Sequence, residues 1–184
     1  MRFFYIRHAP TEANMSGDMV KDYDSFSIMP FDTSKWHEKV GINLPKDFKL
    51  FVSPAKRCQE TAKALFPTHE YKILNSLEEF DCSVLNGKKF WEISEEEFNQ
   101  ITKFDKKQMF ERCKTMLIEI ANNAFIDDNV VIIGHGFYGR LLCSYWMEDN
   151  DSVYNILNSK NFQLRNLDMV YSVDKEIKSV YRWN

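Results

Sequence analysis

Short runs of apolar residues alternate along this chain with segments in which apolar positions recur every three or four residues. The apolar runs at 2–6, 49–52 and 130–133 predict buried strands, and a shorter run at 71–74 predicts another. Strand patterns that alternate with helical patterns are typical of an α/β layered fold. We therefore expect a central sheet with helices packed against it.

Three segments carry the spacing of a helix. The clearest runs from 105 to 125, where apolar residues fall on one face. A second is predicted to start at Ser53, a capping residue followed by Pro54 in the first helical position, and to end near Phe66. A third covers 137–147.

The remaining segments predict a hairpin and two insertions. Residues 169–173 and 177–182 have the pattern of two paired strands. Segments 15–48 and 82–104 break the alternation, which favours either lids over a site or surface excursions. Without a repeat or a clear linker, we expect residues 1–184 to form one domain with two lid-like insertions.

Three aromatic residues and two histidines in or near the insertions are candidates for ligand contacts. Trp36, Phe90 and Trp91 would suit stacking on a base or a sugar if they belong to lids. His37 and His69 are assigned to the surface or the lid, because neither has a partner at the spacing of metal ligands.

Composition and charge restrict the partners. Hydrophobic residues make up 44% and charged residues 28% of the chain, which is ordinary for a globular protein. The net charge of −3 and the lack of a basic cluster argue against nucleic acid. No run approaches the roughly 18 apolar residues of a membrane span, and the amino terminus lacks the pattern of a signal peptide. We expect no membrane partner.

The cysteines indicate the compartment. Cys58, Cys82, Cys113 and Cys143 are widely spaced and include no Cys-x-x-Cys pair. This usage favours free thiols in a reducing compartment, so we expect a cytoplasmic protein, with zinc binding as the lesser alternative.

Candidate chemistry gathers where the predicted strands end. Arg7 and His8 follow the first strand, Arg57 lies four residues past Ser53, and His135 follows the run at 130–133. Open α/β sheets hold their ligands at the carboxyl ends of the strands. Two arginines and two histidines at that edge suit a small dianion such as phosphate, although each alone would also fit a surface arginine or a structural histidine.

These residue types suit phosphoryl chemistry. A neutral imidazole at His8 is a competent nucleophile. Arginine charge at Arg7 and Arg57 would bind phosphoryl oxygens and disfavour protonation of the imidazole. Thr11 and Asn14 would add neutral donors to the same oxygens.

A proton donor is available further along the chain. Glu78, Glu79 and Asp81 follow Leu77 in one short segment. One of these carboxylic acids would protonate a leaving oxygen and later activate water. A solvated acidic turn is the alternative explanation.

Two other interpretations fit parts of the sequence. Residues 134–139 match the Gly-x-Gly-x-x-Gly dinucleotide pattern, but the match begins at residue 134 of 184 and leaves Arg7, His8 and Arg57 without a role. A pocket that binds a phospho-ligand without turnover remains open, although binding alone requires neither a nucleophile nor an acid.

The chain resembles the histidine phosphatase superfamily, branch 1, the phosphoglycerate-mutase-like proteins. The resemblance rests on four motifs in family order: Arg7, His8, Ala9, Thr11 and Asn14; then Ser53, Arg57, Thr61 and Ala62; then Leu77, Glu79 and Gly87; then His135 and Gly136. It implies a three-layer αβα sandwich with a mostly parallel central sheet, and it covers residues 2 to 140.

The resemblance also implies an activity. It implies a phosphomonoester hydrolase for a small phosphorylated substrate, with a phosphohistidine at His8 and neither a metal nor an organic cofactor. Glu79 would be the general acid and then the base, with Glu78 as the competing assignment. The residues implied to hold the phosphoryl group are Arg7, Thr11, Asn14, Arg57, His135 and Gly136. A homodimer is left open.

The chain departs from the family pattern at Ala9, Ser83 and Leu85-Asn86, where the family has Gly, Gly and Trp-Glu. Family mutases tend to be longer and carry Arg-His-Tyr-Gly after the catalytic Glu, whereas this chain has residues 80–83 as Phe-Asp-Cys-Ser. The short length and the missing motif favour a phosphatase over a mutase. The presence of His8 and Glu79 argues against a non-catalytic binder, whereas the loss of Trp-Glu keeps that alternative open. In size the chain is similar to ribazole-phosphate and broad-specificity phosphatases, and the natural substrate stays open between them.

Overall fold

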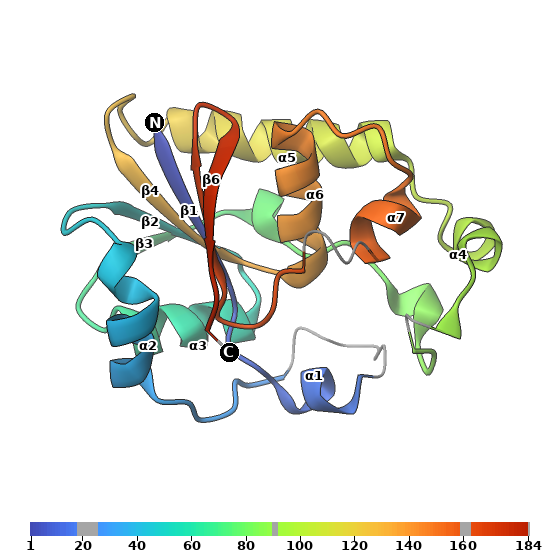
Figure 1. Cartoon of the computed structure of the whole chain (residues 1–184), viewed down its shortest axis with the longest axis horizontal. Coiled ribbons are helices and arrows are strands. Elements are labelled where there is room, and N and C mark those ends of the chain that lie inside the picture. The colour runs from blue at the N-terminus through green and yellow to red at the C-terminus, as the bar shows by residue number, and fades with distance from the viewer. Residues whose placement is uncertain (18–25, 90–91, 159–162, 184) are drawn as a thin grey trace.

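The computed structural model describes residues 1–17, 26–89, 92–158 and 163–183. One six-stranded sheet in the order β3-β2-β4-β1-β5-β6 lies at the centre (Figure 1). Its strands are β1 (Arg2–Arg7), β2 (Lys49–Val52), β3 (Tyr71–Ile73), β4 (Asn129–Gly134), β5 (Met169–Val173) and β6 (Glu176–Tyr181). The first four in the order are parallel, whereas β5 runs antiparallel to β1 and β6 antiparallel to β5.

Helices cover both faces of this sheet. They are α1 (Glu12–Ser16), α2 (Thr33–Lys39), α3 (Lys56–Leu65), α4 (Glu95–Thr102), α5 (Lys106–Ala121), α6 (Gly136–Trp146) and α7 (Val153–Asn158). Short 3₁₀ turns lie at Gly41–Asn43, Asn75–Leu77 and Ser83–Leu85. Figure 1 places α2 and α3 on one side of the strands and α5 and α6 on the other. The predicted three-layer αβα sandwich with a mostly parallel sheet is confirmed.

Alternating side chains of the strands fill two separate cores. In β1, Phe4 and Ile6 pack in the core beneath α2 and α3, whereas Tyr5 packs in the core with α5 and α6. The four apolar residues 130–133 of β4 alternate in the same way and are wholly buried. Burying one such side chain stabilises the fold by about 1.5–3 kcal/mol. A strand buried on both faces therefore appears in sequence as a continuous apolar run.

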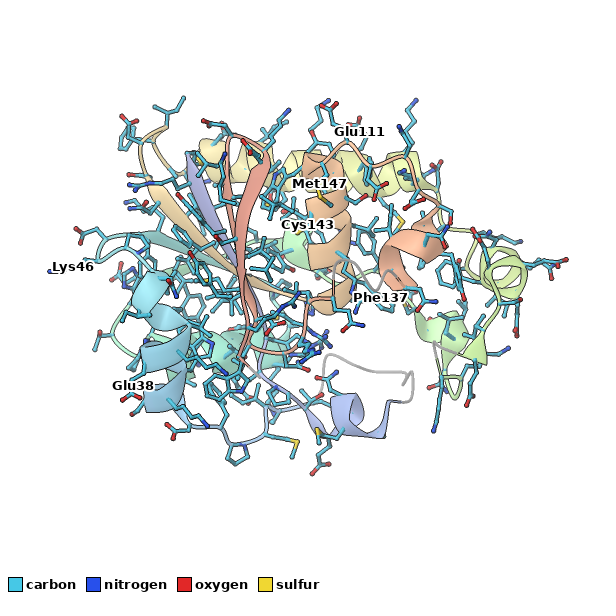
Figure 2. The ribbon with its side chains drawn as sticks, viewed as in Figure 1. Glu38, Lys46, Glu111, Phe137, Cys143 and Met147 are labelled. Atoms are coloured by element: carbon cyan, nitrogen blue, oxygen red, sulfur yellow. The ribbon has the colours of Figure 1, made fainter. Side chains whose placement is uncertain are left out.

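Charged side chains on the outer surfaces of the helices and loops point outward. Glu38, Lys46 and Glu111 project away from the molecule, whereas Cys143 lies inside on α6 (Figure 2). All four cysteines lie in the described part of the chain and are free thiols, as predicted. Within that same part, no helix is long and apolar enough to cross a membrane.

The start of α3 differs from the prediction. The helix begins at Lys56 with Ala55 as its cap residue, and no side chain caps it. Ser53 is used elsewhere, because its Oγ lies 2.7 Å from Nε2 of His135. The end of α3 at Leu65, with Phe66 as the cap residue, agrees with the prediction.

The hairpin and the longest helix were predicted nearly to their ends. Asp174 and Lys175 both have positive φ in the turn between β5 and β6, the backbone shape that two-residue hairpins prefer. Helix α5 starts after Asp105, whose side chain accepts a hydrogen bond from the amide of Lys107. It stops at Ala121, four residues earlier than predicted.

The insertions are partly built into the core. Trp36 on α2 is fully buried, and its Nε1 donates to the backbone oxygen of Leu167 at 2.9 Å. The prediction that Trp36 stacks on a ligand from a lid is therefore wrong. In the second insertion Phe98 of α4 is fully buried in the core that includes α5 and α6. Phe90 and Trp91 lie outside the described residues.

Candidate active site

The parallel strands end at one level, which brings the predicted site residues together. Arg7 is paired with Gly134 at the ends of β1 and β4. The amide of His8 donates to the oxygen of Gly134 at 2.9 Å, and the amide of Ser53 donates to that of Ile133 at 3.0 Å. Residues that immediately follow these three strands therefore share one edge of the sheet.

His8 is held as one defined tautomer. Its side chain is buried, with 2% of its surface exposed, and Nδ1 lies 2.7 Å from the backbone oxygen of Ala9. A carbonyl oxygen only accepts, so Nδ1 carries the hydrogen. Nε2 then carries the lone pair and accepts from Nε of Arg57 at 3.2 Å. The ring thus presents Nε2 as its nucleophilic nitrogen.

The surroundings keep this imidazole uncharged. Burial lowers the pKa of His8 well below its ordinary value, and the charges of Arg57 and then Arg7 lower it further. The hydrogen bond to Ala9 acts in the opposite direction. A neutral ring is the form that can attack phosphorus.

Arg57 connects the two histidines. Its guanidinium is buried, with 1% of the residue exposed, and Nη2 lies 2.8 Å from Nδ1 of His135. Arginine only donates, so Nδ1 of His135 accepts and its Nε2 donates to Oγ of Ser53 at 2.7 Å. Burial, followed by the charge of Arg57, lowers the pKa of His135 well below its ordinary value.

Both ring nitrogens of His135 have protein partners here, Oγ of Ser53 and Nη2 of Arg57. The predicted contact of His135 with a phosphoryl oxygen stays a prediction. Sequence reasoning missed the part played by Ser53, which has the features of a helix cap. Its spacing of 82 residues from His135 leaves no local signal.

Arg7 lies against Gly136, the first residue of α6. Nη1 of Arg7 donates to the backbone oxygen of Leu164 at 2.7 Å. A Cβ at position 136 would come within 3.0 Å of Cζ and 3.1 Å of Nε of Arg7. Glycine at this position therefore makes room for the guanidinium of Arg7, whereas a contact of Gly136 with a phosphoryl group stays a prediction.

Glu79 binds the first turn of α6. Its carboxylate accepts hydrogen bonds from the amides of Phe137 at 3.1 Å and Tyr138 at 2.9 Å, and from its neighbour Phe80 at 3.1 Å. Burial raises the pKa of Glu79, although Arg57 and these amides act against the shift. Glu78 is exposed, so the structure brings Glu79 and not Glu78 to the site.

Arg112 of α5 holds the segment that carries Glu79. Its Nε donates to the oxygen of Ser76 at 3.3 Å, and Nη2 donates to the oxygen of Glu78. The guanidinium lies over the rings of Phe80 and Tyr138, 4.9 and 5.5 Å from their centroids. No local pattern indicates this role, because an arginine on the polar side of a helix usually faces water.

Thr11 and Asn14 cap α1. Oγ1 of Thr11 accepts from the amide of Asn14 at 3.4 Å, and Oδ1 of Asn14 accepts from the amide of Thr11 at 3.1 Å. Oγ1 of Thr11 also donates to Oδ1 of Asn14, and Thr11 is fully buried. The predicted phosphate contact of Thr11 is therefore replaced by helix capping, whereas Asn14 lies beside the His8 segment, to which Asn166 connects it.

Arg140 is a further cation near the site that the sequence did not predict. It lies one helical turn after Gly136 on α6, and its Nη1 donates to the oxygen of Leu157. Burial, followed by the charge of Arg7, lowers its pKa to about 10. Across the described ranges of the chain, no group of three or more His, Cys, Asp or Glu is placed to hold a metal ion.

Comparison with known proteins assigns the family. Residues 35–172 match the model of the histidine phosphatase superfamily (branch 1). The chain belongs to this superfamily. The matched region contains Arg57, Glu79 and His135, and the fold adds Arg7 and His8 from outside it. No curated protein sequence gives a match.

Solved structures share the histidine phosphatase fold over nearly the whole chain. A phosphoserine phosphatase from Entamoeba histolytica, in complex with 3-phosphoglyceric acid, has a TM-score of 0.78 at 17% identity and covers 98% of this chain and 96% of its own. A phosphoglycerate mutase from Thermus thermophilus has a TM-score of 0.69 at 14% identity and covers 100% of both chains. Membership of the histidine phosphatases supports an enzyme of the phosphatase type.

Proposed function

We propose that this histidine phosphatase hydrolyses a small phosphomonoester through a phosphohistidine at Nε2 of His8. The observation that carries the proposal is the state of the His8 ring. Its Nδ1 is bonded to Ala9, its Nε2 lone pair points toward a buried arginine, and its pKa is lowered. Phosphate binding alone does not require a neutral, oriented imidazole.

In the first step the guanidinium groups of Arg7 and Arg57 bind the phosphoryl oxygens, with Asn14 beside them. The Nε–H of Arg57 then leaves Nε2 of His8 for a phosphoryl oxygen, which frees the lone pair of Nε2. Nε2 of His8 forms a bond to phosphorus while the bond from phosphorus to the ester oxygen breaks. Glu79 in its carboxylic acid form gives its proton to the leaving oxygen, so an alcohol departs. The hydrogen on Nδ1 stays with the ring, where the oxygen of Ala9 stabilises the charged phosphohistidine.

In the second step water replaces the alcohol. Glu79, now a carboxylate, takes a proton from the water. The oxygen of that water attacks phosphorus, and the bond from phosphorus to Nε2 of His8 breaks. Inorganic phosphate leaves, and His8 and Glu79 return to their starting forms. The raised pKa of Glu79 supports both roles, because an acid tuned toward neutrality can give and regain a proton.

Phosphate release from a panel of phosphomonoesters in the presence of EDTA tests the proposal. Wild type is expected to release phosphate, and His8→Ala is expected to lose at least about 10³-fold of the rate while keeping the far-UV circular dichroism of the folded chain. Mass spectrometry of the quenched wild-type reaction should place one phosphoryl group on His8. Activity in His8→Ala equal to wild type would overturn the mechanism, and transfer to a second substrate instead of water would indicate a mutase.

A further inference from the structure

We infer that the loop 164–168, which precedes β5, is a positioning element that sets Arg7 and His8 in place through two separate arms. The inference rests on the proposed function for the roles of these two residues. One arm is the side chain of Asn166, and the other is the turn closed by the carboxylate of Asp168.

The first arm links the nucleophile to Asn14. Nδ2 of Asn166 donates to the backbone oxygen of His8 at 2.9 Å and to Oδ1 of Asn14 at 3.2 Å. The two hydrogens of this amide therefore have one acceptor each. Because Oδ1 of Asn14 also accepts from Thr11, the orientation of the Asn14 amide is fixed as well. Asn166 thus joins the nucleophile and a neighbouring donor from more than 150 residues away.

The second arm holds Arg7 at three points. The amide of Arg7 donates to the oxygen of Asp168 at 3.2 Å, and its own oxygen accepts from the amide of Leu167 at 3.0 Å. Its guanidinium donates to the oxygen of Leu164. Backbone and side chain of Arg7 are therefore both positioned by the loop.

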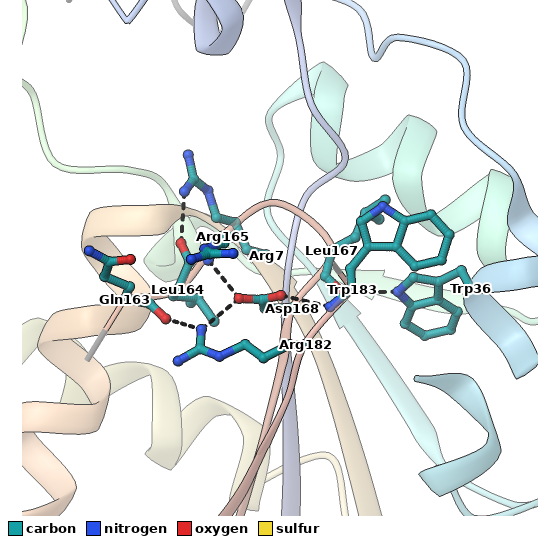
Figure 3. Close-up of polar contacts among 9 residues, drawn as sticks. All are labelled: Arg7, Trp36, Gln163, Leu164, Arg165, Leu167, Asp168, Arg182 and Trp183. Carbon is teal, nitrogen blue, oxygen red and sulfur yellow. Dashed lines mark hydrogen bonds and ion pairs between the residues drawn. The ribbon is translucent and has the colours of Figure 1, made fainter. Parts of the chain in front are cut away.

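The carboxylate of Asp168 keeps this turn closed. It is fully buried and accepts from the amide of Arg165 at 2.9 Å, from the amide of Trp183 at 2.9 Å and from Nη1 of Arg182 at 2.6 Å (Figure 3). Three donors on one carboxylate join the loop to the residues after β6. Removal of the charge would loosen the turn that holds Arg7.

The backbone of Leu167 indicates that the loop is constrained. Leu167 has a φ of 65°, a left-handed conformation that non-glycine residues rarely adopt. Its side chain is fully buried, its amide bonds to Arg7 and its oxygen bonds to Trp36 (Figure 3). Conformations of this kind persist where several contacts determine them together.

The two arms predict different kinetic effects. Asn166 contacts the nucleophile segment, so its loss should misplace Nε2 and lower kcat with little change in KM. Asp168 acts on an arginine that binds phosphoryl oxygens, so its loss should raise KM and weaken the binding of inorganic phosphate. A substitution that only destabilised the fold would lower the folded fraction. It would not lower kcat in one variant and raise KM in the other.

The first test is Asn166→Asp, which removes the donor and keeps the shape. An oxygen would then face two acceptors, so we expect kcat to fall about 10²-fold while KM stays within about threefold. Asn129→Asp is the matched control, because Nδ2 of Asn129 also makes a 2.9 Å bond to a distant backbone oxygen, that of Asp47, at the opposite end of β4. Equal effects of the two substitutions would overturn the role of Asn166.

The second test is Asp168→Asn, with Asp174→Asn in the exposed turn of the β5–β6 hairpin as its control. We expect Asp168→Asn to weaken the binding of inorganic phosphate about tenfold and to raise KM accordingly, since a bond to a charged group is lost. Unchanged phosphate affinity in the folded variant would overturn the second arm. If wild type binds phosphate but turns over no ester, the proposed function fails. The phosphate affinity of Asp168→Asn then still tests whether the second arm positions Arg7.

Discussion

The backbone amide of Tyr138 donates a hydrogen bond of 2.9 Å to Oε1 of Glu79. This contact places the carboxyl group at the amino end of α6, where amide groups and the helix dipole favour a negative charge. Burial nevertheless dominates, and the pKa of Glu79 is raised. The side chain of Glu79 is therefore a carboxylic acid over a wider pH range than an exposed glutamate. When it loses its proton, the amides at the start of α6 stabilise the carboxylate.

Glu79→Gln should discriminate between leaving groups. For an alkyl phosphate, whose alcohol needs a proton, we expect kcat/KM to fall about 10²- to 10⁴-fold. For p-nitrophenyl phosphate, whose phenolate leaves unaided, the loss should be at least tenfold smaller. Glu78→Gln, at the exposed neighbouring position, should change both substrates by less than about threefold. An equal loss on the two esters would remove Glu79 from the role of proton donor.

The pH profile should follow the two shifted groups. The reactive form has a neutral His8 and a protonated Glu79. Because the pKa of His8 is lowered and that of Glu79 is raised, the acid limb of kcat/KM should lie below the ordinary histidine range and the basic limb above the ordinary glutamate range. Glu79→Gln should abolish the basic limb. An acid limb centred at the ordinary pKa of histidine would contradict this assignment.

Stability should decrease in acid. His8 and His135 have lowered pKa values in the folded protein, so in the unfolded chain they take up protons first as the pH falls below about 6.5. Each such proton reduces the free energy of unfolding by about 1.4 kcal/mol per pH unit until the folded pKa is reached. Urea titrations give the free energy of unfolding at each pH from 7 to 5. Its decrease per pH unit should be smaller for His135→Asn than for the control His37→Asn, which is at an exposed position. Equal slopes would show that burial of His135 does not oppose its protonation.

Two glycines of α6 should separate binding from stability. Gly136→Ala moves only the guanidinium of Arg7, the mobile end of a side chain, so we expect an unchanged thermal midpoint and phosphate binding weakened severalfold. Gly139→Ala would meet Leu164 and Tyr5 at 2.5 Å in the core and should cost about 1–3 kcal/mol. Scanning calorimetry measures the thermal midpoint of both variants, and titration calorimetry measures their affinity for inorganic phosphate. A destabilised Gly136→Ala with normal phosphate affinity would contradict the placement of Arg7.

Local patterns predicted the fold well because the sheet is buried on both faces. The runs at 2–6 and 130–133 appear where predicted, and the strand ends bring Arg7, His8 and His135 together as expected. These predictions depend only on neighbouring residues and on parallel strands sharing one edge.

Predictions failed where a distant partner decides the outcome. Ser53 has the features of a helix cap but bonds to His135. Trp36 lies in a segment whose sequence pattern predicts no regular element, yet it is on α2 and bonds to Leu167 in the core. Asn166 and Arg112 escaped notice because a polar side chain has the same local pattern whether it meets water or a backbone oxygen far along the chain.

The central position of β1 has a consequence for how the protein acquires its shape. The strand that carries Arg7 is made well before its hydrogen-bonding neighbours β4 and β5, which begin at residues 129 and 169. Non-local pairing of this kind slows folding, because the entropy cost of closing a long loop comes before the strands make any stabilising contact. Until then the apolar strand stays unpaired on the nascent chain, and an exposed apolar strand of this kind is prone to aggregation.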